Sequence, residues 1–181
     1  MKKFAYLLLT ILIVGSAFAA QQDPMVGGAA MYPTKNIIQN AVNSADHTTL
    51  VAAVKAAGLV DTLSGPGPFT VFAPTNEAFG KLPAGTVDSL LKPEMKDTLA
   101  KVLTYHVVAG RMSSKNIAKA IKAGNGTAAL KTVSGGTLKA SMSGKDLVLT
   151  DEKGGTAKVT IADVFQSNGV IHVVDTVVMP N

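Results

Sequence analysis

The stretch from Phe69 to Phe79 (FTVFAPTNEAF) constrains the fold more than any other part of this chain. Its first half predicts a strand, because apolar side chains recur at every second position, at Phe69, Val71 and Ala73. Phe72 makes the second face of that strand apolar as well. A strand with two apolar faces has to be covered on both sides, so the rest of the chain is predicted to pack around it.

The second half of the same stretch stops the strand and starts a helix. Pro74 has no backbone N–H and removes one donor from the strand ladder. Thr75 or Asn76 can then cap a helix, because a short side-chain oxygen accepts from the free N–H groups of the first turn. Phe79 directs this helix back at the core. No nucleophile stands beside a base here, so the stretch is interpreted as a structural corner.

The N-terminus predicts export from the cell. Lys2 and Lys3 precede an apolar run at 4–14, and Ala17-Phe18-Ala19 offers the small residues that a signal peptidase reads. A signal peptide is therefore expected at 1–19, and the mature protein is expected to be extracellular or periplasmic, with or without attachment to the cell surface. A membrane anchor is the alternative, but the run has about 11 residues where a spanning helix needs roughly 20.

Composition narrows the chemistry of the exported chain. It has no Cys, which excludes disulfides, thiolate catalysis and Cys-ligated metals. Without Lys2 and Lys3, 15 basic residues face 12 acidic ones, an excess too small to indicate nucleic-acid binding. No later segment is apolar enough to cross a membrane. A flexible lead-in is expected at 20–35, where Gly and Pro interrupt any periodicity, and a single domain at 36–180.

Helical patterns fill the middle of the chain and strand patterns fill its second half. Thr48 or Thr49, and later Ser113 or Ser114, are predicted helix caps. Late strands are predicted at 130–133, 137–142, 146–150, 157–165 and 170–178. A turn containing Asn168-Gly169 joins the last two, since both residues tolerate positive φ. The early strand must pair with these late ones to be buried, so the predicted fold class is α+β, a sheet or sandwich with short helices along one edge.

Three segments, in this order, resemble the fasciclin domain family. Residues 69–79 are similar to its first signature, NGVIHVVD at 168–175 is similar to its second, and Tyr105-His106 resembles the Tyr-His pair between them. The resemblance covers 36–180 and implies a wedge-shaped β-sandwich with several short flanking helices. It also implies a secreted or surface-attached adhesion module without catalytic residues. The signature residues expected to be structural are Phe69, Phe72, Pro74, Thr75, Asn76, Phe79, Asn168, Gly169 and His172.

The resemblance also suggests two contact sites. In animal members an Asp-Ile pair just before the second signature is linked to integrin contact, and the matching residues here are Asp163 and Val164. The short basic leader and single domain are typical of a bacterial protein, which has no integrin of its own, so the pair is a candidate contact for another partner or an ordinary turn. The surface around Tyr105 and His106 is linked to binding in the family as well. On this sequence His106 continues an apolar helical stripe, which favours a buried, hydrogen-bonded histidine.

No pattern predicts catalysis, a metal site or a cofactor. His47, His106 and His172 lie far apart in the sequence, and none has a second ligand at the spacing of a metal site. His172 stands within an apolar strand, which favours a packed side chain. Asp151 and Glu152 are adjacent carboxylates in a predicted hairpin and are expected to be solvated.

Two functions therefore remain open. The first is a secreted adhesion or matrix-interaction module that contacts a protein or polysaccharide. The second is a binding protein for a small apolar ligand, a lipid or carotenoid, in a cleft between helices and sheet; relatives that bind carotenoids suggest it, although the same apolar residues make an ordinary core. Lys115, Lys119 and Lys122 form one basic helix face, which is either solvated or a site for an anionic polymer.

Overall fold

The computed structural model describes residues 23–181, so the expected signal peptide at 1–19 lies outside the described residues. Within 23–181 no helix has both the length and the apolar character that crossing a membrane requires. The helices are α1 (Ile37–Ala41), η1 (Ala45–His47), α2 (Thr48–Ala56), α3 (Val60–Ser64), α4 (Asn76–Gly80), α5 (Thr86–Leu90), η2 (Pro93–Met95), α6 (Lys96–Tyr105) and α7 (Ser114–Ala123). The strands are β1 (Met25–Val26), β2 (Ala29–Ala30), β3 (Phe69–Pro74), β4 (Val107–Ala109), β5 (Thr127–Lys131), β6 (Thr137–Ser143), β7 (Asp146–Thr150), β8 (Thr156–Gln166) and β9 (Gly169–Val174).

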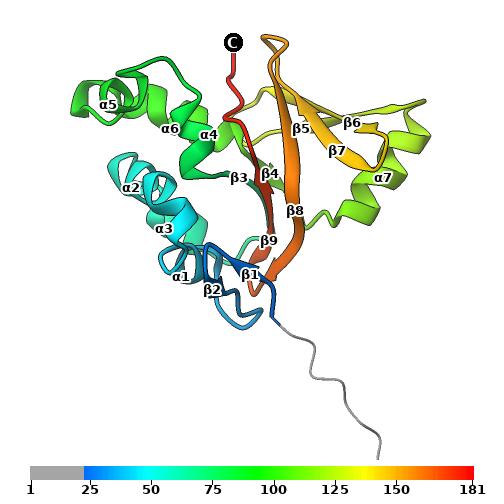
Figure 1. The fold of residues 1–181 in the computed structure, drawn as a ribbon, viewed down its shortest axis with the longest axis horizontal. Helices are drawn as coiled ribbons and strands as arrows, with labels where there is room; N and C mark the ends of the chain where they lie inside the picture. The colour runs from blue at the N-terminus through cyan, green and yellow to red at the C-terminus, as the bar shows by residue number, and fades with distance from the viewer. Residues whose placement is uncertain (1–22) are drawn as a thin grey trace, which may run out of the picture.

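Seven strands form one sheet in the order β4-β3-β9-β8-β7-β6-β5 (Figure 1). The long strand β8 serves both halves of it: Thr156 to Lys158 pair with β7, and the residues from Val159 onward pair with β9. Two irregularities in register interrupt the second pairing, and such bulges bend a strand. A single bridge between Val108 and Thr132 joins the two outer ends of the sheet, so it is nearly closed. The predicted α+β class is confirmed.

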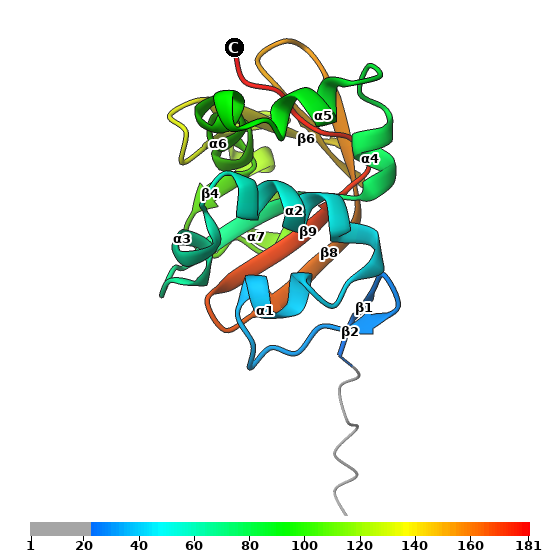
Figure 2. The ribbon, with the colours of Figure 1, turned by 90° about the vertical axis from the view of Figure 1, so that its left-hand side faces the viewer.

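Helices cover the sheet in two groups. In Figure 2, α1 and α2 lie across β9 and β8 on the side that faces the viewer, and α3 lies beside them. Helix α7 packs on β5 and β6 at the opposite end of the sheet (Figure 1). Each group closes its own apolar core, one beneath α1–α6 and one between α7 and the late strands.

Strand β3 divides these two cores, as its two apolar faces predict. Val71 and Ala73 belong to the core beneath the first helices, while Phe72 belongs to the core beneath α7. The neighbour of β3 is β9, in parallel register from Phe69 opposite Gly169 to Pro74 opposite Val174. The expectation that the early strand pairs with a late one is confirmed, and the two family-like signatures lie side by side.

The start of the domain differs from the expected loose lead-in. Met25–Val26 pairs with Ala29–Ala30 in a small hairpin, and Val26 and Met31 are buried in the first core. The sequence shows no periodicity here because each strand has only two residues. The lead-in is therefore part of the packed structure from residue 25 onward.

The last strand is shorter than predicted. Strand β9 ends at Val174, whereas the apolar pattern continues to Val178. The pattern continues because Val177 and Val178 are buried without being in a strand. Their segment is held by side chains instead, with the N–H of Val178 bonded to His106 and that of Met179 bonded to Asp151.

Candidate functional site

Asn168, in the second signature, joins three separate parts of the backbone. Its side-chain oxygen accepts from the N–H of Ile37 at 3.0 Å, and its amide group donates to the carbonyls of Leu63 and Gly65, each at 2.8 Å. These bonds connect the β8–β9 turn to the start of α1 and the end of α3. Asn168 is thus a structural residue of the fold, as its place in the signature suggests.

Gly169 is needed for a different reason from the one predicted. Only Asn125 and Asp163 among the described non-glycine residues have positive φ, and Gly169 is not among the glycines that do. The β8–β9 loop consists of Ser167 and Asn168, since Gln166 already pairs with Gly169. A Cβ atom on Gly169 would overlap the carbonyl oxygen of Phe69. The glycine therefore permits close approach of two parallel strands.

Asn76 and Thr75 both act at helix starts, but on different helices. Thr75 caps α4, its hydroxyl accepting from the N–H of Ala78 at 3.2 Å, as predicted. The Asn76 side chain instead accepts from the N–H of Thr49 at 3.0 Å, in the first turn of α2. The expected local cap by Thr48 or Thr49 is therefore wrong, because the side chain that bonds to the first turn comes from 27 residues further along the chain.

The Tyr105-His106 pair is buried. Tyr105 is fully enclosed, and its hydroxyl donates to the carbonyl of Thr137 at 2.9 Å and accepts from the N–H of Glu152 at 3.2 Å. His106 bonds through Nδ1 to the carbonyl of Val102 at 2.8 Å, so Nδ1 carries the proton, and Nε2 accepts from Val178. Burial lowers the pKa of His106 to about 4. The expectation of a buried, hydrogen-bonded His106 is confirmed.

His172 is also a packed, neutral side chain. It stacks on Phe72 with ring centroids 5.6 Å apart. Its Nε2 donates to the carbonyl of Met112 at 2.8 Å, and Nδ1 accepts from the N–H of Asp163 at 3.3 Å. Burial lowers its pKa, against smaller opposing effects from the Met112 bond and the charge of Asp163. Both ring nitrogens are thus occupied, which confirms the packed histidine.

Asp163 and Val164, the candidate contact pair, have unequal access to solvent. Val164 is fully buried in the first core and is not part of the surface. Asp163 is half-buried in the second irregularity of β8, with φ of +60°. Its carboxylate accepts from the N–H of Ser114 at 2.7 Å and from the Ser114 hydroxyl. Of this pair, only Asp163 can meet a partner, and its carboxylate is already bonded at the start of α7.

His47 differs from the other two histidines because one ring nitrogen has no partner. Nδ1 lies 2.9 Å from the hydroxyl of Ser44, whereas the buried Nε2 makes no hydrogen bond with any described residue. Burial lowers the pKa of His47, and the nearby carbonyl of Ala73 opposes this effect only in part. That carbonyl does not form a hydrogen bond of good geometry with Nε2. His47 lines an apolar cavity beneath α1 and α2, which shares Ile37, Ala41, Leu50 and Val71 with a second one.

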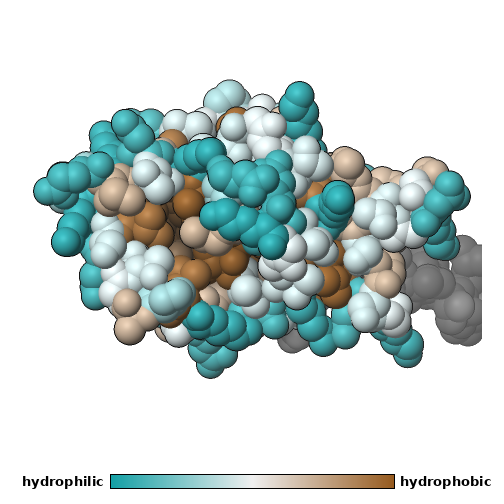
Figure 3. Space-filling model, turned by 90° about the horizontal axis from the view of Figure 1, so that it is seen from above, coloured by the Kyte–Doolittle hydropathy of each residue, from teal (hydrophilic) through white to brown (hydrophobic). Residues whose placement is uncertain are grey.

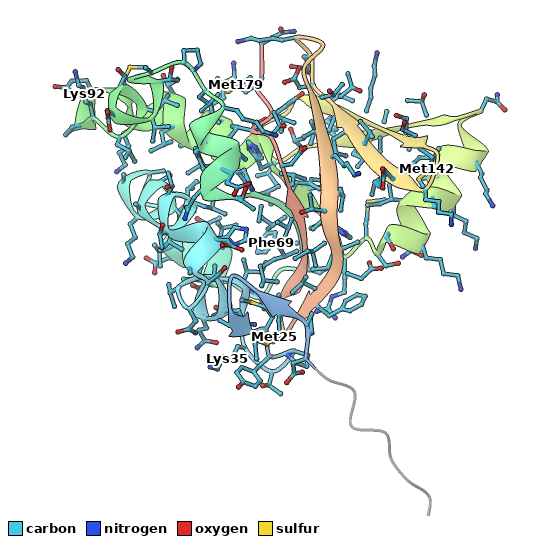
Figure 4. All side chains as sticks on the ribbon, viewed as in Figure 1. Met25, Lys35, Phe69, Lys92, Met142 and Met179 are labelled. Carbon is cyan, nitrogen blue, oxygen red and sulfur yellow. The ribbon has the colours of Figure 1, made fainter. Side chains whose placement is uncertain are left out.

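A more open groove lies between α7 and the late strands. It has a volume of about 310 Å³. Its lining mixes cationic, acidic, hydroxyl and apolar side chains, and comprises Ser114, Lys115, Ala118, Met142, Lys145, Asp146, Leu147, Val159, Thr160 and Ala162. Figure 4 places Met142 on the β6–β7 side, above α7. Sequence reasoning found the lysine face of α7 but not this groove, because its walls are more than 20 residues apart in the chain.

The expectation that Asp151 is solvated is wrong. Asp151 is buried, and its carboxylate accepts from the N–H groups of Lys153, Gly155 and Met179. The expectation for Glu152 holds, since this side chain is exposed, and bonds to the N–H groups of Thr137 and Asn181 lower its pKa. Within 23–181 no three His, Asp or Glu side chains come close enough together to hold a metal ion.

Seen from above, the surface is mostly hydrophilic, with apolar side chains visible in a hollow toward the end that carries α5 and α6 (Figure 3). Partly buried residues from these helices and the segments beside them pack on the first core, among them Leu82, Leu91 and Met95.

Comparison with known proteins places these observations in a family. The fasciclin domain model matches residues 45–180. Protein sll1483 of Synechocystis sp. is 45% identical over 164 residues, covering 88% of this chain and 82% of that protein. The cell surface glycolipoprotein MPB83 of Mycobacterium bovis is 35% identical, over 92% of this chain and 64% of its own length. The structure of a domain pair from the insect cell adhesion molecule fasciclin I matches with a TM-score of 0.68 at 18% identity, over 78% of this chain and half of that one.

Proposed function

This chain belongs to the fasciclin domain family, and from that premise we propose that it is an exported adhesion or matrix-interaction module that works without catalysis. The proposed partner is a protein or polysaccharide at the cell surface or in the matrix. A related protein is named as a cell surface glycolipoprotein, and the matching structure comes from a cell adhesion molecule. These relatives support a role at the cell surface.

One observation carries this proposal: the signature residues bond to the protein itself. Tyr105, His106, Asn168 and His172 are buried, and their polar atoms are bonded to backbone groups. Polar groups bonded in this way have no hydrogen-bonding capacity left for a substrate. They support a rigid scaffold whose surrounding surface is available to a partner. Asp163 is the one half-exposed residue of the proposed contact set and stays a candidate contact.

The test is attachment under flow. Beads coated with residues 20–181 are placed on surfaces of the producing organism and on its isolated matrix, and the flow that detaches them is measured. Folded protein should hold beads at several times the flow that heat-unfolded protein withstands. Asp163→Asn should lower that flow if the carboxylate is a contact. Equal detachment of folded and unfolded coatings would contradict the adhesion role itself.

A second candidate function is the binding of a small apolar ligand. The adjoining cavities beneath α1 and α2 favour it, because their lining is almost wholly apolar and His47 Nε2 offers one unused polar atom. The volumes of these cavities are about 40 and 30 Å³, which is enough for only a few heavy atoms. A lipid or carotenoid therefore requires α1 to move away from the sheet.

Native mass spectrometry and an absorbance spectrum of protein from its own host test this candidate. A bound apolar molecule should be present in the unaltered protein and lost in Ala41→Leu, since Ala41 lines both cavities. A clean mass for the unaltered protein would count against ligand binding.

A further inference from the structure

The groove between α7 and the late strands has unequal charge. Lys115 lies on α7 and Lys145 in the β6–β7 turn, and both are exposed. Neither makes an ion pair with any residue in 23–181, where the ion pairs are Lys81–Asp175 and Lys158–Asp146. The groove therefore carries two lysine charges that have no ion-pair partner among the described residues.

The two acidic residues beside these lysines are already engaged. Asp146 lies 2.7 Å from the ammonium group of Lys158. The Asp163 carboxylate accepts both hydrogen bonds that Ser114 donates. Lys158 neutralises Asp146, whereas the hydrogen bonds from Ser114 leave the negative charge of Asp163 in place at the start of α7. The two lysines therefore outnumber the one carboxylate beside the groove that has no ion-pair partner, and the groove keeps a positive excess.

The remaining lining residues fit an acidic sugar better than they fit other anionic ligands. Ser114 and Thr160 supply hydroxyl groups, while Met142 and its neighbours form an apolar wall. Such a mixture matches a pyranose ring, which has hydroxyl edges and C–H faces. None of the residues lining the groove is aromatic, so a neutral glycan or a nucleic-acid base has no ring to stack on. Recognition must therefore rest on charge together with hydroxyl contacts.

The basic surface continues out of the groove along α7. Lys119 and Lys122 follow Lys115 at helical spacing, on the face opposite the buried Ile117 and Ile121. At 1.5 Å per residue, the three lysines span about 10 Å of helix. A repeating anionic polymer can contact the groove and this face together, which a single small anion cannot.

We propose that the groove between α7 and the β6–β8 strands binds an acidic polysaccharide, with Lys115 and Lys145 pairing with uronic-acid carboxylates. This inference rests on the proposed adhesion function and names the class of its partner. The contacts lie on the surface of α7 and the β6–β7 turn, away from the apolar cavities under α1 and α2.

The experiment is calorimetric titration of residues 20–181 with polygalacturonate oligomers, in low salt and in physiological salt. The protein should bind in low salt and bind more weakly in physiological salt, because exposed ion pairs are screened. Dextran, a neutral polymer, should not bind. Absence of polygalacturonate binding in low salt would overturn the proposal, as would equally tight binding of single-stranded DNA, which would indicate an unselective polyanion surface.

Paired variants locate the site. Lys115→Gln with Lys145→Gln should weaken binding about fivefold or more, given what exposed ion pairs contribute. The matched control is Lys92→Gln with Lys96→Gln, which removes the same charge from exposed positions between α5 and the start of α6. Figure 4 shows Lys92 at the other side of the molecule from Met142. Met142→Glu should also weaken binding, because it places a negative charge at the groove. Equal effects of the two lysine pairs would overturn the assignment to this groove.

Because these titrations use free polymer in solution, they are independent of bead attachment. Beads that detach easily while the oligomers still bind in the groove would contradict the adhesion role alone. If the beads stay attached but the groove variants bind the oligomers as well as the unaltered protein does, only the assignment of binding to the groove is contradicted.

Discussion

Asp163 and Ser114 connect the bend in β8 to the start of α7. The carboxylate of Asp163 accepts from the Ser114 N–H at 2.7 Å and from its hydroxyl, while the Asp163 N–H donates to His172. The residue that the family resemblance marks as a contact is therefore also the residue that bonds the first residue of α7 to β8. Any substitution of Asp163 has to be interpreted for stability before it is interpreted for binding.

Asp163→Ala should destabilise the protein by about 1–3 kcal/mol, because the Ser114 N–H loses its acceptor and alanine tolerates a φ of +60° poorly. Asp163→Asn should cost less, since asparagine tolerates this φ and keeps one acceptor oxygen. Ser114→Ala, which removes only the hydroxyl bond, should cost about 1 kcal/mol. Urea unfolding measures all three. Equal stability of the alanine variant and the unaltered protein would contradict a structural role for Asp163.

Asn168→Ala should cost about 2–4 kcal/mol, because it leaves the Ile37 N–H and two carbonyls without partners. Asn168→Asp should be no better, since its carboxylate faces the carbonyls of Leu63 and Gly65. The matched control is Asn116→Ala on the exposed face of α7, which should be nearly neutral. Thermal and urea unfolding compare the three, and an unaltered midpoint for Asn168→Ala would refute the bridging role.

Gly169→Ala should destabilise the protein by about 1–3 kcal/mol through overpacking, because its Cβ would meet the Phe69 carbonyl oxygen, which is backbone and cannot move aside. Gly80→Ala is the control: its Cβ would enter open space at the end of α4, so stability should stay the same or rise slightly. If both variants unfold at the same denaturant concentration, the close approach of β3 and β9 is not what requires glycine.

Stability should fall in acid because His106 is buried as the neutral form. Its pKa is about 4 in the folded protein and near 6.5 when unfolded, so the unfolded chain binds more protons between these values. Stability is therefore full above pH 6.5 and decreases as the pH falls toward 4, by about 3 kcal/mol from His106. His47 and His172, whose pKa values are also lowered, act in the same direction.

NMR titration of the histidine rings checks this directly, alongside urea unfolding at several pH values. The His106 ring should keep its neutral signals well below pH 6, and His106→Gln should flatten the dependence of stability on pH. A ring that titrates near pH 6.5 in the folded protein would show that His106 is not buried as a neutral side chain.

Local patterns predicted a large part of this fold. Strand β3 was found from its alternation, its end from Pro74 and the cap of α4 from Thr75, because each depends on neighbours within a few residues. The lysine face of α7 followed from helical spacing in the same way. The buried states of His106 and His172 followed from the apolar residues around them.

Other features depended on contacts between distant segments. Asn76 bonds to the first turn of α2, and the carboxylate of Asp151 accepts from the N–H of Met179. Gly169 lies against Phe69 on the adjacent strand. No pattern along the chain carries such information, because Thr49, Met179 and Phe69 lie tens of residues from the side chains they meet. The Ser114 bond to Asp163 belongs to this group as well.

The sequence by itself thus determined most of the elements, the family resemblance and the absence of cysteine chemistry, since these follow from residue types and short spacings. Only the tertiary structure decided which polar groups are already bonded and which stay available. It buried Val164, bonded Asp163 and Asn168 to other parts of the chain, and brought Lys115 and Lys145 to one groove in which neither forms an ion pair. The physical reason is that availability for binding depends on burial and on hydrogen-bond partners, and both are set by packing between distant parts of the chain.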